Sequence, residues 1–461
     1  MIRCKGKVST MNGRACRCVV AVVALAALDL SCFMTAPLGA AEPTVYGLGD
    51  CIAIAQKSNP EIAIAAENCQ KAEGNLLMNY GSLLPEFSMN FTTGHRFYGP
   101  SSVQYDASGR PVQSNGFDYP DYGFGLSSDI QLYDGGGNYS RIRSAMSGRD
   151  ATSEQLKHLK DVIAARVIRA YYDLVRNKML VRVQEESAEL AKKNLERSEA
   201  LLQVGSATKA DVLKARVRYS NTRLAMIQAK NDVELAREDL SVLLNMRDSG
   251  AIDVDTTITI EFTEYDAAAE VQSAMVYRSD LKSLEYGIKS ARASVSAARS
   301  GWLPSLYASF GYNWNDRQMP ENYINFFDNE YTWYVAGYLR LNIFDRFQTS
   351  SSVRMAKADA RIAEHNFEKA QLEAARQVKS IIIIITQARE RIVVATETVE
   401  QAAEDVRLAG ERYRVGAGTM LESIDAQVAL TQAKADVIEA KCDFLIASAD
   451  LAVATGKRVY K

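Results

Sequence analysis

The sequence predicts an α+β protein made of a duplicated unit: a long antiparallel α-helical coiled-coil barrel plus four transmembrane β-strands per protomer. Two Val-Gly-x-x-Thr turns, Val204–Thr208 and Val415–Thr419, each join two helical patterns, and Gly205 and Gly416 are 211 positions apart. A pair of segments with alternating apolar and polar residues precedes each motif, and apolar residues step by three and four between them. Internal repetition of this kind indicates duplicated architecture.

Both motifs have the chemistry of a tight turn between two helices. Gly205 and Gly416 accept the left-handed backbone conformation that ends a helix. Thr208 and Thr419 are expected to cap the next helix by accepting a backbone N–H. We therefore expect two αα-hairpins.

Composition excludes several classes of protein. The 461 residues carry a formal net charge of −2, which indicates no nucleic-acid partner. No apolar run reaches the 18–20 residues of a membrane-spanning helix after processing. The three histidines share no ligand spacing, and Cys51, Cys69 and Cys442 match no zinc or CxxC pattern, although a Cys51–Cys69 disulfide is conceivable. We expect no enzyme activity, no metal and no cofactor.

The N-terminus resembles a secretory signal peptide. Basic residues precede the apolar run 19–28, and Gly39 and Ala41 supply the small residues before a cleavage site. Cleavage is expected after Ala41. A lipoprotein alternative would use Cys32, whose preceding residues fit a lipidation motif poorly.

Four segments alternate with period two, as strands do when one face is apolar and the other polar. In the first, Phe87, Met89 and Phe91 alternate with polar residues; the others cover about 122–133, 305–315 and 332–343. Four strands cannot close a barrel, and open edges are not tolerated in lipid. Three copies would supply twelve strands around a polar lumen. A soluble sheet half buried on a core is the other interpretation.

Long helices are predicted over about 140–204, 209–246, 350–415 and 419–455, each free of internal proline. The first would be roughly 100 Å long. Thr256–Phe262 is predicted as a short strand in the connector. The expected boundaries are a signal peptide 1–41, N-terminal helices 42–85, β-hairpin 86–134, helical hairpin 138–247, connector 248–268, helices 269–303, β-hairpin 304–344, helical hairpin 350–456 and tail 457–461.

From Leu48 to Gly456 the chain resembles the TolC-like outer membrane efflux proteins. The resemblance rests on both Val-Gly-x-x-Thr hairpins, on the Leu-Pro junctions at Pro85 and Pro304, and on the duplicated order. It implies a homotrimeric channel-tunnel with a barrel in outer membrane lipid and a helical extension in the periplasm. It also implies docking to a periplasmic adaptor (membrane fusion) protein and an inner-membrane pump or ABC transporter.

The resemblance also implies roles for single residues. Tyr413 matches a gate tyrosine, Glu422 and Asp425 match acidic rings in the lumen, and Asp211 matches their acidic partner. Gly418 stands where the family member compared has an arginine, which puts the closing ion-pair network in doubt although the acidic ring is kept. The residues expected to contact the adaptor are Val204, Gly205, Ser206, Ala207, Thr208, Val415, Gly416, Ala417, Gly418 and Thr419.

Elementary physics agrees with the ring. Glu422 and Asp425 are three apart, so they share one helix face, and near a threefold axis they would favour cations. The alternative is that both acids only complement the helix dipole. Arg340, on a polar strand face, is expected to face the lumen.

The sequence thus predicts a passive exit duct of a tripartite efflux or type I secretion system. The alternative is a periplasmic coiled-coil scaffold or tether without a channel. Small-molecule efflux and protein export are not separated by these residues, because the partner pump decides between them.

Overall fold

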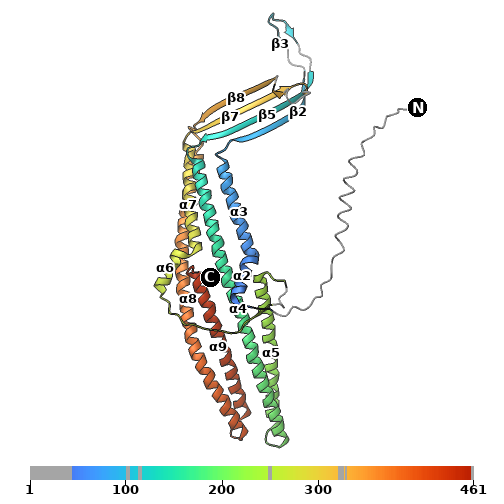
Figure 1. Ribbon diagram of the computed structural model, residues 1–461, viewed down its shortest axis with the longest axis vertical. Helices are drawn as coiled ribbons and strands as arrows, with labels where there is room; N and C mark the ends of the chain where they lie inside the picture. Colours follow the sequence, from blue (N-terminus) through green and yellow to red (C-terminus); the bar gives the residue numbers. More distant parts are fainter. Residues whose placement is uncertain are drawn as a thin grey trace, which may run out of the picture. The chain divides into compact units, whose positions relative to one another are not determined.

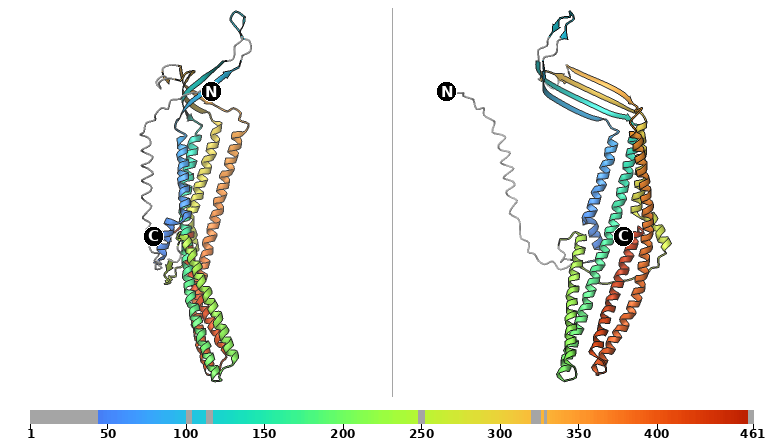
Figure 2. Two further views of the ribbon diagram at one scale, coloured as in Figure 1. Left: turned by 90° about the vertical axis from the view of Figure 1, so that its right-hand side faces the viewer. Right: turned by 180° about the vertical axis from the view of Figure 1, so that it is seen from behind.

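The computed structural model describes residues 44–99, 104–112, 117–247, 252–319, 326–327 and 330–457. The predicted signal peptide, the cysteine of the lipoprotein alternative and residues 458–461 of the predicted tail lie outside the described residues. The description below concerns the compact unit of residues 45–461, together with the strand that begins at Thr44. Figure 1 shows its helices and its main sheet, and Figure 2 shows two further sides.

The helices carry most of the chain. Two of them, α4 (Gly137–Gln203) and α8 (Gln348–Arg414), have 67 residues each. Each turns at its end into a returning helix, α5 (Lys209–Leu244) or α9 (Met420–Ala454). The shorter helices are α2 (Leu48–Ser58), α3 (Pro60–Gly81), α6 (Ala267–Tyr277), α7 (Ser279–Arg299) and η2 (Ser300–Trp302). The predicted long helices are confirmed.

Two apolar cores hold the helices together, one for each half of the repeat. The first joins α4, α5 and α2 through Ile163, Leu174, Leu240 and Cys51, all 0% exposed. The second joins α6, α8 and α9. Its central members are Ala274, Val378, Ile381, Ile385, Phe444 and Leu451. Cys51, Cys69 and Cys442 are free thiols, so the conceivable disulfide is absent among these described cysteines.

The main sheet has four antiparallel strands in the order β2-β5-β7-β8. They are β2 (Glu86–Tyr98), β5 (Phe117–Tyr133), β7 (Ser305–Asp316) and β8 (Tyr331–Arg340). Short strands β3 (Gln104–Tyr105) and β4 (Pro111–Val112) pair within the loop between β2 and β5. In Figures 1 and 2 the sheet extends beyond the ends of α3, α4 and α7.

One predicted strand is wrong. Thr256–Phe262 has no strand partner; instead β6 (Ile252–Val254) pairs with β1 (Thr44–Tyr46). The apolar residues of the predicted strand are in contact with helices, because Ile258 and Ile260 pack on the two cores and the Phe262 ring meets the Phe444 ring edge to face, 5.4 Å between centroids. The alternation is real, but helices rather than a second strand cover it.

None of the described helices is long and apolar enough to cross a membrane.

Candidate functional site: the hairpin tips and the two-faced sheet

The first hairpin tip is closed by reciprocal hydrogen bonds. Gly205 has φ of 75°, which lets the chain leave α4. The Thr208 hydroxyl accepts from the Asp211 backbone N–H at 3.2 Å and donates to the Asp211 carboxylate at 2.7 Å, while the Thr208 N–H donates to the same carboxylate at 3.1 Å. The hydrogen bond from the Thr208 hydroxyl, followed by the one from its backbone N–H, lowers the pKa of Asp211. Asp211 therefore has a local role in capping α5.

The second tip repeats the backbone but not the bonding of its acid. Gly416 has φ of 76°, and the Thr419 hydroxyl accepts from the Glu422 N–H at 3.2 Å. The Glu422 carboxylate faces the Arg412 guanidinium across the tip, 4.0 Å away. Arg412 also donates to the Ala417 carbonyl at 3.4 Å. Arg412 was not identified from the sequence, although its place in the last turn of α8, where cations are favourable, was a signal.

The remaining predicted gate residues lie on these same turns. Tyr413 is half buried, and its hydroxyl is buried without a hydrogen-bond partner among the described residues. Asp425 is exposed at the start of α9. Within the described chain, no recorded side-chain bond joins Asp211 to Tyr413, Glu422 or Asp425.

The two hairpins are joined along α4 and α9. The Ser198 hydroxyl meets the Met420 sulfur at 3.9 Å just above the tips. Farther up, Lys434 pairs with Glu186 at 2.6 Å. Both tips thus belong to one packed bundle, as Figure 2 shows from two sides.

Each tip also presents apolar surface. Val204 and Val415 are 73% and 68% exposed, although valine is usually buried. The other tip residues are exposed, except for the half-buried Ala207 and Gly418. Two equivalent turns therefore offer a paired, partly apolar surface at the same end of the bundle.

The main sheet has one polar face. Pairing places Ser88 beside Ser127, with their hydroxyl oxygens 2.7 Å apart, and Gln131 donates to the Tyr307 hydroxyl at 2.7 Å. Asn90 lies over Gly125 and Tyr334 over Gly311, where a Cβ on either glycine would collide with these side chains. This face is therefore hydrophilic.

Arg340 lies on that polar face, at the end of β8. It is paired with Ser305, and its guanidinium sits 5.9 Å from the centroid of the Tyr307 ring. The Tyr307 and Tyr338 rings are stacked, with centroids 5.0 Å apart. Arg340 therefore lies on the polar face of the sheet, where the alternation of the sequence puts it.

The opposite face is apolar and largely uncovered. Phe87, Met89 and Val335 are 70%, 72% and 71% exposed. A cluster around Trp314, which Phe326 contacts edge to face at 4.8 Å, is the buried exception. Exposed aromatic and aliphatic side chains on a continuous face are typical of an interaction with lipid or another chain. The described residues form no core against this face, which argues against the interpretation as a sheet half buried on its own core.

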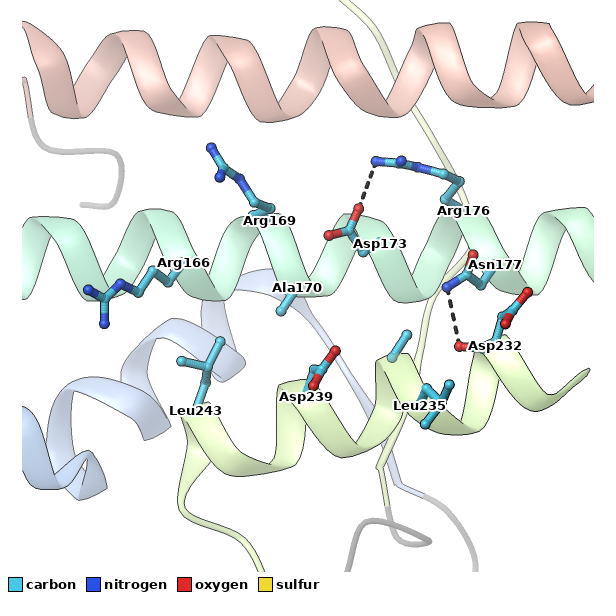
Figure 3. Close-up of a pocket in the computed structure, with 11 residues that line it drawn as sticks. Arg166, Arg169, Ala170, Asp173, Arg176, Asn177, Asp232, Leu235, Asp239 and Leu243 are labelled. Atoms are coloured by element: carbon cyan, nitrogen blue, oxygen red, sulfur yellow. Dashed lines mark hydrogen bonds and ion pairs between the residues drawn. The ribbon is translucent and has the colours of Figure 1, made fainter. Parts of the chain in front are cut away.

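A groove of about 520 Å³ lies between α4 and α5 (Figure 3). Its walls carry both signs of charge, including Arg166, Asp173, Arg176 and Asp239. Burial raises the pKa of Asp173 although Arg176 and Arg169 oppose the change. Arg176 donates to Asp173 at 2.7 Å, so these two charges pair with each other. No group of three potential metal ligands occurs among the described residues.

Comparison with known proteins identifies the family. Residues 51–246 and 271–457 match the family described as outer membrane efflux protein. Protein CyaE of Bordetella pertussis is 22% identical over 56% of this chain and 54% of its own length, so the chain spans about half of that relative. Outer membrane protein TolC of Vibrio cholerae is 23% identical over 76% of this chain and 77% of its own.

The fold agrees with that assignment. The solved structure of the outer membrane protein VceC from Vibrio cholerae is similar, with a TM-score of 0.76 at 16% identity, over 89% of this chain and 96% of that one. The solved structure of CusC, whose description names transmembrane channel formation, is also similar, with a TM-score of 0.77 at 16% identity over 90% of this chain and 93% of that one. By its sequence and its fold, this chain belongs to the outer membrane efflux protein family.

Proposed function

We propose that three copies of this chain form an outer membrane channel whose helices extend into the periplasm. The channel is a passive exit duct for small molecules or proteins. An inner-membrane pump or ABC transporter supplies the energy, and a periplasmic adaptor joins it to the hairpin tips. The predicted domain boundaries describe the parts of this duct, with residues 86–134 and 304–344 as its membrane hairpins.

The two-faced sheet is the observation that carries this proposal. Its apolar face has large exposed side chains, and its polar face carries hydroxyls, amides and Arg340. Strands β2 and β8 form its two edges, and the outer side of each has no partner among the described strands. In lipid, such edges are satisfied only by closure into a barrel. Three copies give twelve strands, with the polar face turned to a water-filled lumen.

A tether without a channel explains this sheet poorly. A tether needs only the helices, and Phe87 and Val335 would then expose apolar surface to the aqueous periplasm at a cost of roughly 25 cal/mol for each Å².

The tips support the proposed gate and the docking site. Glu422 and Asp425 begin α9 on neighbouring turns, and threefold repetition would place six carboxylates around one opening. The capped turns, with Val204 and Val415 exposed, fit a surface that an adaptor covers.

Fractionation and electrophoresis test the assembly. The channel is expected in the outer membrane as an oligomer of three copies that heating dissociates. Recovery as a soluble monomer would instead support the tether. Photo-crosslinkers at Ala207 and Ala417 on the tips would then capture the adaptor, with a matched probe at exposed Glu397 on α8 as the control.

A further inference from the structure

The last strand of the sheet stops earlier than its sequence pattern. The alternation of β8 continues through Leu341, Asn342 and Ile343, yet the strand ends at Arg340, where β7 begins at Ser305. Leu341 and Ile343 are 55% and 96% exposed. These residues have the pattern of a strand and no described strand beside them.

The repeat supplies a template for the missing neighbour. Glu86 pairs with Asp129 in the first hairpin, and Ser305 pairs with Arg340 in the second. First strands are therefore related by 219 positions and second strands by 211. The helix starts agree: Asp134 accepts from the Asn138 N–H at 2.6 Å and Asp345 accepts from the Thr349 N–H at 2.7 Å, again 211 apart.

Inside the chain, one seam joins the second strand of a hairpin to the first strand of the next. This is β5 against β7, with Asp129 opposite Ser309 and Gln131 opposite Tyr307. In a ring of copies, the equivalent seam joins β8 of one copy to β2 of the next. In the second repeat, 211 positions later, Asp129 and Gln131 correspond to Arg340 and Asn342. In the first repeat, 219 positions earlier, Ser309 and Tyr307 correspond to Asn90 and Ser88.

We propose that β8 continues to Asn342 and pairs antiparallel with β2 of a second copy in the register of the internal seam. The expected pairs, with the β2 residue from the second copy, are Leu339–Phe91, Arg340–Asn90, Leu341–Met89 and Asn342–Ser88. This inference rests on the proposed function, because it needs copies arranged in a ring. It adds the register and the residues that each copy contributes.

The chemistry of the faces supports this register. Leu339 and Leu341 would meet Phe91 and Met89 on the apolar face, and all four are at least half exposed in the single chain. Arg340 and Asn342 would meet Asn90 and Ser88 on the polar face. A slip of one residue would set apolar side chains against the polar face, so only registers shifted by two compete.

The register of the internal seam, which the repeat offsets carry over unchanged, favours the proposed register over those competitors.

Paired cysteines test the register. Asn342→Cys combined with Ser88→Cys is expected to link copies covalently when outer membranes are oxidised with copper phenanthroline. Disulfides need Cβ atoms about 3.8 Å apart, which directly opposite strand residues approach. Leu341→Cys with Met89→Cys is a second in-register pair with the alternate hydrogen-bonding geometry.

Matched controls separate this register from its competitors. Asn342→Cys with Asn90→Cys, and Asn342→Cys with Glu86→Cys, probe shifts of two residues; each single variant controls for the native thiols. Efficient linkage in one of these shifted pairs, or none in either in-register pair while the variants still form heat-sensitive oligomers, would overturn the register and leave the channel intact. Absence of any oligomer from the unmodified protein would instead overturn the proposed function.

Discussion

Arg412 and Glu422 face each other across the second hairpin tip at 4.0 Å, in space that Gly418 leaves open. A Cβ on Gly418 would lie 3.1 Å from the Arg412 Cβ and 3.2 Å from the Glu422 carboxylate. Position 418, where the compared family member has an arginine, is glycine here, and the cation near the Glu422 carboxylate comes from the preceding helix. The acid at the tip retains a partner, which comes from its own hairpin.

Gly418→Ala is expected to loosen this tip. The added methyl pushes Arg412 from Glu422, and hydrogen exchange of the first turn of α9 should accelerate. Gly410→Ala is the control, because Gly410 lies within α8 and a Cβ there would meet nothing within 4 Å. This substitution should slow exchange in the last turns of α8, since alanine favours a helix over glycine by about 1 kcal/mol. Equal effects of both substitutions would contradict a specific role for Gly418.

The two capping threonines are expected to differ in energy. Thr208→Ala removes a cap and a hydroxyl–carboxylate bond, whereas Thr419→Ala removes only the cap, a loss of about 1 kcal/mol. Local exchange at the start of α5 should therefore accelerate more than at the start of α9. Thr208→Ser, which keeps the hydroxyl, should stay close to the unmodified protein. A larger effect at Thr419 would contradict the hydrogen-bonding difference between the tips.

Asp211 predicts a pH dependence at the first tip. Its hydrogen bonds lower its pKa in the folded chain, so its contribution to stability is present above the ordinary aspartate pKa of about 3.9. That contribution is lost as pH falls through the lower folded pKa. The Tm difference between the unmodified protein and Asp211→Asn should shrink over this acid range. Asp405→Asn, exposed on α8, controls for net charge; a difference that grows on acidification would contradict the sign.

The proposed acidic ring predicts a defined conductance phenotype. Glu422→Gln with Asp425→Asn should weaken cation selectivity and block by divalent cations in lipid bilayers, because six carboxylates are neutralised in a trimer. Glu397→Gln, exposed on α8 and several turns before its end, should leave both unchanged. Unchanged divalent block in the double variant would reduce these acids to partners of the helix dipole.

The sequence predicts most of the fold because its signals are local and repeated. Gly205 and Gly416 mark the turns, and the three-four periodicity covers the long helices within a few residues of their ends. The left-handed turn before α8 is not evident from the sequence. Arg346 and Phe347 have φ of 54° and 64° where the first repeat has glycines, so residue type alone does not reveal the conformation.

The features that the sequence does not predict are contacts between elements rather than the periodicity within them. Ile258 and Ile260 alternate as in a strand, but their cover is a pair of helical cores that local sequence does not encode. The Arg412–Glu422 pair depends on how α8 and α9 meet across the turn, which the sequence of either helix does not reveal. Leu341 and Asn342 continue the alternation beyond the end of β8 and, in our proposal, their neighbours belong to another copy.

Conductance of the protein purified from outer membranes tests the central claim most directly. Three copies that close a barrel around the polar face should insert into planar bilayers and give discrete, cation-selective current steps. Vesicles prepared in the same way without the protein provide the baseline. A purified chain that remains monomeric in aqueous buffer and produces no current steps would contradict the channel.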